Sequence, residues 1–293
     1  MLALALPSSA RAQHAAGAIS SDPARDPANP AAMETFQLPS HGALLNALVY
    51  VAEGPGPHPV VVLLHGFPGN EKNLDLAQAL RRAGWDVLYF DYRGSWGSPG
   101  DFSFTHCIED TQAAIAYMRE PANAKKLRAD PARIVLVGHS MGGFMANYAG
   151  AQDPKIEAVV MISAADQGGM RARSEANPSG DEDAVKSIAA SLAAEGMAPL
   201  AGCTPESLAR EIIANHAQWE FTTNAAKLAT RPVLVITSDD GLAPANAAFV
   251  AAARKAGGTK VIAAHMTTDH SYSDERIALE TVVLNWLAAL PKM

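Results

Sequence analysis

The sequence predicts an α/β fold with a mainly parallel sheet and helices on both of its faces. Three observations support this prediction. Short apolar segments of strand length alternate with segments that carry apolar residues at helical spacing. Residues 60–64 are five apolar residues in a row, as expected for a strand that is covered on both faces. The 293 residues, 48% of them hydrophobic, suffice for one large core or for a core with an insertion.

The expected elements follow one another in a regular order. Residues 44–51 alternate weakly and predict an antiparallel strand near the edge of the sheet. Further strands are expected at 60–64, 85–92, 134–137, 158–162, 233–236 and 261–264. Core helices are expected at 71–83, where Gly84 is a stop signal, and at 106–119, 141–151, 245–255 and 274–290.

The alternation is interrupted at residues 167–230, which contain no convincing strand. Helical runs are expected there at 181–195 and 205–219, and Thr204 is a candidate N-cap of the second. An insertion of this size between two core strands suggests a helical cap over the carboxyl ends of the strands, where open α/β sheets bind ligands. We therefore assign the core to residues 34–166 and 231–293, and a helical cap insertion to 167–230.

Residues 1–33 are interpreted as a disordered leader or the remnant of a signal peptide. The first six residues are apolar, and Ala10-Arg11-Ala12 resembles the small-x-small cleavage site of a secretory signal. The apolar run is short and no positively charged segment precedes it. On this pattern a periplasmic or secreted location is favoured, with the cytoplasm as the alternative.

Composition and charge argue against several classes of partner. The formal net charge is −7 and no basic run occurs, so neither nucleic acid nor an anionic membrane surface is expected to bind. No apolar stretch approaches the roughly eighteen residues that span a bilayer. Cys107 and Cys203 lack metal-ligand spacing, so no metal site is expected. Two free thiols are favoured over a disulfide between them.

A serine-containing turn is the most informative motif. Residues 138–142 read Gly-His-Ser-Met-Gly, between the expected strand at 134–137 and a helical run. Such a Gly-x-Ser-x-Gly turn places Ser140 on a sharp strand-to-helix connection, with a helix N-terminus behind it that favours developing negative charge. Ser140 is therefore the candidate nucleophile.

A serine nucleophile needs a base, and that base needs an acid that holds its tautomer and stabilises its charged form. On a turn of this kind the partners are expected in the chain order Ser, acid, His. Asp239 and Asp240 both follow the strand at 233–236. We choose Asp240 because Asp240 and Pro244 form the Asp-x-x-x-Pro spacing associated with the acid of this fold, with Asp239 as the alternative. Asp166 is a weaker candidate.

His270 is the candidate base. It lies after the strand at 261–264 and before the C-terminal helix, where the base is expected. His265 lies at the strand end itself, which is too early, and His216 falls in an expected helix of the cap. His139, inside the serine turn, is expected to pack rather than react.

Acyl transfer also needs donors for an oxyanion. One is expected to be the backbone N–H of Met141, directly after the nucleophile. The other should come from the glycine-rich loop His65-Gly66-Phe67-Pro68-Gly69-Asn70, with the Phe67 N–H as the preferred donor and His65 in a structural role.

With these residues assigned, the chain resembles the α/β-hydrolase superfamily from about residue 44 to 290. The resemblance rests on residues 65–69 (His-Gly-Phe-Pro-Gly), 91–94 (Asp-Tyr-Arg-Gly) and 138–143, on Asp240 with Pro244, and on His270. Within the superfamily it is most similar to bacterial serine esterases and prolyl-oligopeptidase-like hydrolases. The resemblance implies an α/β-hydrolase fold with an eight-stranded, mostly parallel sheet, a Ser-His-Asp triad and no cofactor.

The leading hypothesis is a serine esterase for small to medium ester substrates. A peptidase or amidase would use the same groups, and a non-catalytic binding protein would have no need of all three triad residues. Candidate pocket walls are aromatic residues of the cap and of the loop at 95–105, although packing between cap and core would explain them equally well: Trp96, Phe102, Phe104 and Trp219. No oligomeric state is predicted.

Overall fold

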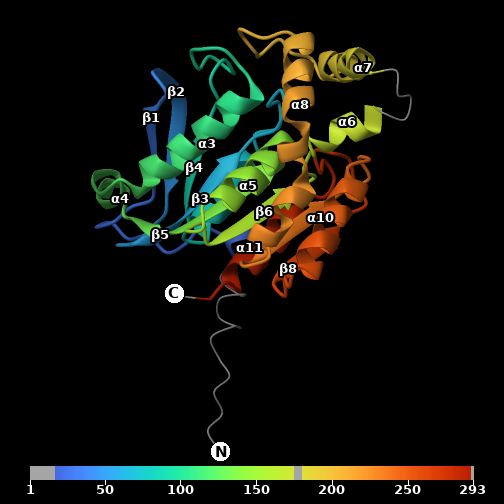
Figure 1. Cartoon of the computed structure of the whole chain (residues 1–293). Helices are drawn as coiled ribbons and strands as arrows, with labels where there is room; N and C mark the ends of the chain where they lie inside the picture. The colour runs from blue at the N-terminus through green and yellow to red at the C-terminus, as the bar shows by residue number, and fades with distance from the viewer. Residues whose placement is uncertain (1–16, 175–179, 292–293) are drawn as a thin grey trace, which may run out of the picture.

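An eight-stranded sheet lies at the centre of the computed structural model, which describes residues 17–174 and 180–291 (Figure 1). Its spatial order is β1-β2-β4-β3-β5-β6-β7-β8. The strand pairs β1–β2 and β2–β4 are antiparallel, and the pairs from β4 to β8 are parallel. The strands are β1 (Ala32–Ser40), β2 (Ala43–Val51), β3 (His58–Leu64), β4 (Asp86–Phe90), β5 (Ala129–His139), β6 (Ala158–Ile162), β7 (Val233–Thr237) and β8 (Val261–His265). The predicted fold class is confirmed.

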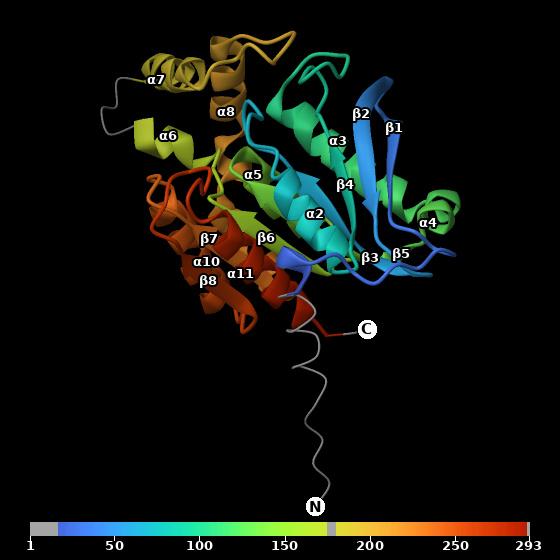
Figure 2. The same ribbon diagram turned by 180° about the vertical axis from the view of Figure 1, so that it is seen from behind.

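Helices cover both faces of this sheet, because its central strands are apolar on both sides. Those toward the viewer in Figure 1 include α3 (Phe104–Arg119), α5 (Met141–Gln152) and α10 (Ala243–Lys255). From behind, in Figure 2, the helices α2 (Leu74–Arg82) and α11 (Arg276–Ala288) lie on the opposite face. A short helix, α4 (Pro121–Leu127), precedes β5.

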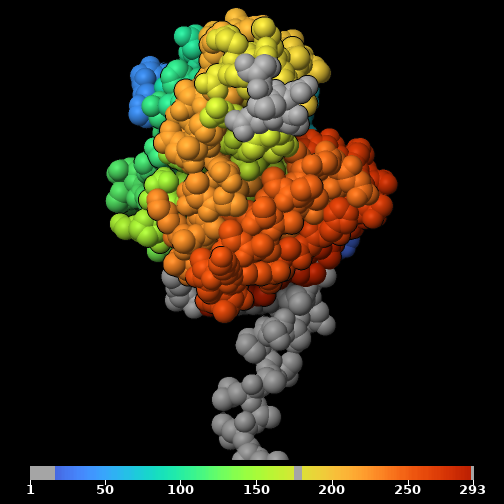
Figure 3. Space-filling view, turned by 45° about the vertical axis from the view of Figure 1, so that its right-hand side comes forward, coloured from blue at the N-terminus to red at the C-terminus, as the bar shows by residue number. Residues whose placement is uncertain are grey.

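Between β6 and β7, all the secondary-structure elements of the described residues are helices. It holds α6 (Gly169–Ser174), α7 (Asp181–Ala194), α8 (Pro205–Trp219), the 3-10 helix η1 (Phe221–Asn224) and α9 (Ala225–Leu228). Thr204 caps α8 as expected: its side chain accepts the Ser207 N–H, and Ser207 Oγ accepts the Thr204 N–H. We call residues 167–230 the insertion. In Figure 3 its yellow and gold atoms lie above the orange and red atoms of the C-terminal part.

The structure corrects the expected leader at residues 17–33. Strand β1 begins at Ala32, and Ala18 is buried in the same apolar cluster as residues of α2. The Glu53 carboxylate accepts the N–H groups of Asp26 and Ala31, which attaches this segment to the end of β2. Its Ala, Pro and Asp composition concealed these contacts because they are made mostly by backbone groups. The candidate cleavage site at Ala10-Arg11-Ala12 lies outside the described residues.

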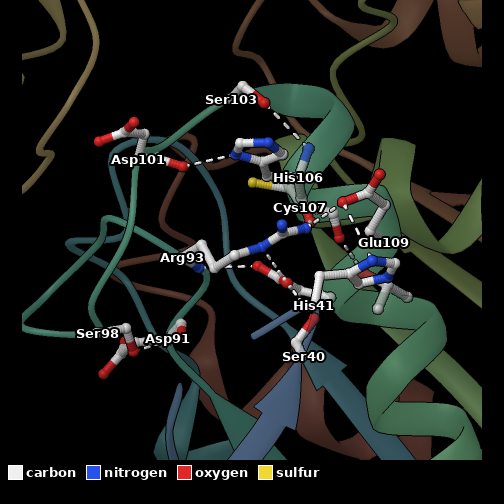
Figure 4. A network of polar contacts seen from close by, with 12 residues as sticks. Ser40, His41, Asp91, Arg93, Ser98, Asp101, Ser103, His106, Cys107 and Glu109 are labelled. Carbon is white, nitrogen blue, oxygen red and sulfur yellow. Dashed lines mark hydrogen bonds and ion pairs between the residues drawn. The ribbon is translucent and has the colours of Figure 1, made fainter. Parts of the chain in front are cut away.

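The loop after β4 is held to α3 by a buried ion-pair network (Figure 4). Arg93 donates its backbone N–H and its Nε to Asp110, at 2.8 and 2.7 Å, and also bonds Glu109. Ser40 at the end of β1 donates to the same Asp110 carboxylate at 2.6 Å. The bonds tie the sheet edge, the loop and α3 together, which gives the Asp-Tyr-Arg-Gly segment a structural role.

The insertion is attached to this loop and to α3. Backbone hydrogen bonds join Gly94 to Ala201 and Trp96 to Pro199. From α8, the Glu211 carboxylate accepts the backbone N–H groups of Phe104 and Thr105, at 2.9 and 2.8 Å. These N–H groups belong to the first turn of α3, which has no intrahelical acceptor for them, and an acidic group is favourable at that end of a helix. No helix among the described residues is long and apolar enough to cross a membrane.

Candidate active site

Ser140 lies at the junction of β5 and α5, at the carboxyl edge of the sheet. Its backbone has φ 58° and ψ −121°, a conformation that L-residues adopt at a cost of about 1–3 kcal/mol. The turn is tightly packed: a Cβ on Gly142 would collide with the Leu64 carbonyl. Glycine is required there because the helix start lies directly against the end of β3. This packing holds the strained serine in place.

Asp240 and His270 meet at the same edge of the sheet. Asp240 follows β7, His270 follows β8, and Asp240 Oδ2 lies 2.7 Å from His270 Nδ1. Burial alone would raise the pKa of Asp240. Its hydrogen bonds to His270, to the Leu242 N–H and to the hydroxyls of Ser163 and Ser238 lower that pKa well below its usual value. The carboxylate is therefore ionised at neutral pH and fixes the N–H of His270 on Nδ1.

The neighbouring aspartate is bound elsewhere. Asp239 Oδ1 lies 3.1 Å from Nε2 of His265, and both side chains are about half exposed. His265 Nδ1 in turn lies 3.0 Å from the Thr237 hydroxyl at the end of β7. The same two loops thus hold one Asp–His pair with a buried carboxylate and a partly exposed imidazole, and one pair in which both side chains are exposed. The geometry separates Asp240 from Asp239 more clearly than the sequence spacing did.

Ser140, Asp240 and His270 line one cavity of about 320 Å³. No hydrogen bond joins the Ser140 hydroxyl to His270 within the described residues. In proteins without substrate such bonds are often long and tighten when the substrate binds, so the arrangement is compatible with proton transfer between the two residues.

The expected oxyanion donors lie on either side of Ser140. Phe67 and Met141 both line the cavity, and neither backbone N–H donates to another group within the described residues. The first N–H of a helix has no intrahelical acceptor, which explains the free donor of Met141. A Cβ on Gly66 would lie 2.9 Å from Ser140 Cβ, so only glycine lets the loop of Phe67 approach the serine this closely.

His65, in the same loop, is buried, as expected for a residue with a structural role. Its Nδ1 bonds the Gly66 carbonyl oxygen at 2.8 Å. Burial lowers the pKa of His65 to about 4, despite Asp91 nearby, so its ring is neutral. It therefore donates from Nδ1 and fixes the loop without adding a charge beside the cavity.

The proposed aromatic pocket walls need correction. None of the four lines the cavity with Ser140. Three of them are buried and pack between α3, α8 and the Phe67 loop, with ring centroids 5.8 to 6.2 Å apart. Trp96 instead donates from Nε1 to the Pro68 carbonyl oxygen at 2.8 Å and lies under the Lys72 ammonium. Large aromatic side chains are mostly buried in protein cores, and these three buried residues follow that rule: Phe102, Phe104 and Trp219.

His139, which was expected to pack, contacts His270. Other residues at the site were not predicted: Ser163 bonds both Ser238 and Tyr272 at 2.9 Å behind Asp240. The cavity wall from the insertion includes Gln167, Met170, Arg173, Ser191, Leu192 and Glu195. Sequence position alone carries no signal for these contacts, because they depend on how the insertion folds over the sheet.

Comparison with known proteins decides the family. A family model described as the alpha/beta hydrolase family matches residues 61–278 of this chain. This protein belongs to the alpha/beta hydrolase family. The match spans the serine turn, the loop of Phe67, Asp240 and His270, and the whole insertion. The predicted superfamily resemblance is therefore confirmed.

Curated relatives of this protein are similar over part of their length. An uncharacterised protein of Mycobacterium tuberculosis is 31% identical over 126 residues, 43% of this chain and 43% of that protein. An uncharacterised 31.7 kDa protein of Escherichia coli is 32% identical over 131 residues, 44% of this chain and 45% of that protein. The chain thus matches less than half the length of these relatives.

Solved structures share the hydrolase fold. An esterase of Pyrobaculum calidifontis has a TM-score of 0.66 and 22% identity, covering 95% of this chain and 88% of that one. An acylaminoacyl peptidase of Pyrococcus horikoshii has a TM-score of 0.65 and 19% identity, covering 89% of this chain and 42% of that one. Est1E of Butyrivibrio proteoclasticus, solved with ferulic acid, has a TM-score of 0.62 and 18% identity, covering 86% and 97%. At these identities the likeness establishes the fold alone.

Proposed function

We propose that this protein is a serine hydrolase that cleaves carboxylic esters of small to medium size through an acyl-enzyme intermediate. One observation carries the proposal: the hydrogen-bonded Asp240–His270 pair and the strained Ser140 line a single cavity. The free N–H groups of Phe67 and Met141 on the same cavity support it. The cavity of about 320 Å³ favours a short or medium acyl group over a long lipid chain.

The reaction follows from these positions. Asp240 keeps the His270 proton on Nδ1, so Nε2 is free to accept the Ser140 hydroxyl proton as Oγ attacks the ester carbonyl carbon. The carbonyl oxygen becomes an oxyanion, which the Phe67 and Met141 N–H groups bind. His270 then gives the proton to the leaving alcohol, and the acyl group remains on Ser140. Water, activated by the same histidine, releases the acid and restores the serine.

The exposed Asp239–His265 pair provides matched controls for the test. We expect Ser140→Ala, Asp240→Asn and His270→Gln to lower kcat by roughly 10³-fold or more on aryl esters, since such residues act as a unit. Asp239→Asn and His265→Gln change the same residue types in the same loops and should retain most of the activity. If Asp239→Asn inactivates the enzyme and Asp240→Asn does not, the acid assignment is wrong.

Experiments on the native protein distinguish the esterase proposal from a peptidase or amidase and from a binding protein. Rates are compared between aryl esters of graded chain length and aminoacyl anilides. Faster cleavage of the anilides would replace the esterase proposal by a peptidase or amidase. A binding protein without catalysis would cleave neither, and a serine-directed fluorophosphonate would not label Ser140.

A further inference from the structure

The cavity wall contributed by the insertion holds a buried amide without a partner. Gln167, five residues after β6, is 3% exposed and lines the cavity with Ser140. Its Oε1 has no hydrogen-bond partner, and no described residue bonds its Nε2. Leaving the buried Oε1 without a donor costs roughly 1–3 kcal/mol of stability. The unbonded Nε2 is a donor that an acceptor of a ligand in the cavity can use.

Two charged side chains of the insertion line the same cavity. Arg173 of α6 is exposed and donates only to a backbone carbonyl oxygen, that of Asp166, at 3.1 Å. The side chain of Glu195, at the end of α7, forms no hydrogen bond or ion pair with any described residue. Arg173 and Glu195 form no ion pair with each other. By contrast, Arg210 on the outer part of the insertion forms a two-point ion pair with Glu182.

Apart from Ser191, whose hydroxyl donates to the Ser187 carbonyl oxygen, the remaining lining residues are apolar or belong to the proposed catalytic set. Phe67, Met141, Ala165, Met170, Leu192 and Leu242 give the cavity its apolar surface. A purely alkyl acyl chain would match these residues but would leave Gln167 Nε2 without an acceptor and the Arg173 guanidinium with only the Asp166 carbonyl oxygen. An ester that also carries a carboxylate would supply acceptors to Gln167 Nε2 and to Arg173, whose positive charge would balance that of the carboxylate.

We infer that the natural substrate is an ester that bears a free carboxylate, bound by Arg173 together with the side-chain amide of Gln167. Arg173 and Gln167 are then specificity-determining residues, and Glu195 limits the affinity for the anion by repulsion. This inference rests on the proposed function, because it names the substrate class of the same site.

The test uses the change in kcat/KM caused by each variant, so that the intrinsic reactivity of each ester cancels. The probes are 4-nitrophenyl hexanoate, which is neutral, 4-nitrophenyl hydrogen adipate, with a carboxylate on the acyl side, and 4-carboxyphenyl hexanoate, with one on the alcohol side. Arg173→Gln and Gln167→Leu should each lower kcat/KM for one of the carboxylated esters roughly tenfold more than for the neutral ester. Arg210→Gln is the matched control and should change none of the three.

Glu195→Gln gives a result of opposite sign. Removing a like charge should raise kcat/KM for the preferred carboxylated ester by a few-fold relative to the neutral one. Gln167→Leu should also melt at the same temperature as the native protein or higher, because it removes a buried amide without partners. A merely structural glutamine would instead lower the melting temperature and affect all three esters alike.

The outcomes separate the inference from the proposed function. If the native enzyme cleaves the neutral ester in a Ser140-dependent way, and Arg173→Gln or Gln167→Leu affects all esters equally, the inference is overturned and the esterase proposal stands. If no ester is cleaved in a Ser140-dependent way, the proposed function fails and the inference fails with it.

Discussion

His139, next to the nucleophile, holds the proposed base in two ways. Its Nε2 donates to the backbone carbonyl oxygen of His270 at 2.8 Å, and the two rings lie 4.8 Å apart between centroids. Burial, together with the nearby His270 ring, lowers the pKa of His139 to about 3. The ring is therefore neutral at any pH where the enzyme would work, and its single N–H is used in this bond. These contacts favour a positioning role of His139 for His270.

At the residue scale we predict that His139→Phe lowers kcat about tenfold with little change in KM. The aromatic ring keeps the packing against His270 but loses the hydrogen bond that orients the loop. His139→Gln retains a donor and should recover part of the rate. Steady-state kinetics on an aryl ester measure both constants, and a loss confined to KM would contradict the positioning role.

Among the elements, β4 begins with a buried carboxyl. Asp86 Oδ1 accepts the Ala52 N–H at the end of β2, at 2.8 Å, whereas its Oδ2 has no partner among the described residues. Burial raises the pKa of Asp86 to about 7, although the Ala52 N–H acts in the opposite direction. Because the folded pKa exceeds the unfolded one, the folded chain holds this proton more tightly. The resulting stability is fully present below the unfolded pKa of about 3.8 and is lost as the pH rises through 7.

At the element scale we therefore predict that Asp86→Asn reduces the loss of stability between pH 5 and pH 8. The native protein should lose about 2 kcal/mol more of its unfolding free energy over this range than the variant does. Urea unfolding at several pH values measures the difference. Asp22→Asn, at an exposed position, is the control; an identical pH dependence for Asp86→Asn and the native protein would refute the account.

The molecule as a whole contains two apolar clusters, one on each face of the sheet. One includes α3, α5 and α8 of the insertion, and the other includes α2 and α11. Ala18 belongs to the second cluster, and its carbonyl oxygen accepts the Arg82 Nε–H at the end of α2. The segment before β1 thus packs beside α2 on the face of the sheet that α2 and α11 cover.

At the scale of the whole molecule we predict that Ala18→Glu lowers the unfolding free energy by about 1 kcal/mol. A charged side chain at this buried position would displace the segment from the cluster. Ala24→Glu, in an exposed part of the same segment, should have almost no effect. Thermal unfolding of the two variants measures this, and equal melting temperatures would mean that the segment adds nothing to stability.

Most of the core and the main residues of the site could be predicted because they leave strong local signals. The buried strands are continuous apolar runs, and β6 was predicted at its observed bounds, residues 158–162. The serine turn combines glycines with a strand and a helix at fixed offsets. Asp240 and His270 could be named because each follows a recognisable strand.

The rest depends on contacts between distant segments. Strand β1 was missed because its residues alternate between exposed and half-buried and contain a proline, Pro39. The choice of large aromatic residues as cavity walls was wrong because these side chains pack between other elements. Gln167 and Arg173, which do line the cavity, have no local sequence pattern that marks a binding site. The role of His139 depends on a loop 131 residues away along the chain.

The strained backbone of Ser140 also bears on the redesign of this protein. Glycine adopts a φ of 58° without the steric cost that any side chain carries, so stability alone favours glycine at this position. A design procedure that scores only the free energy of folding would therefore tend to remove the proposed nucleophile. Engineering for heat resistance should hold residue 140 and its neighbours fixed, because part of the folding energy maintains the reactive geometry there.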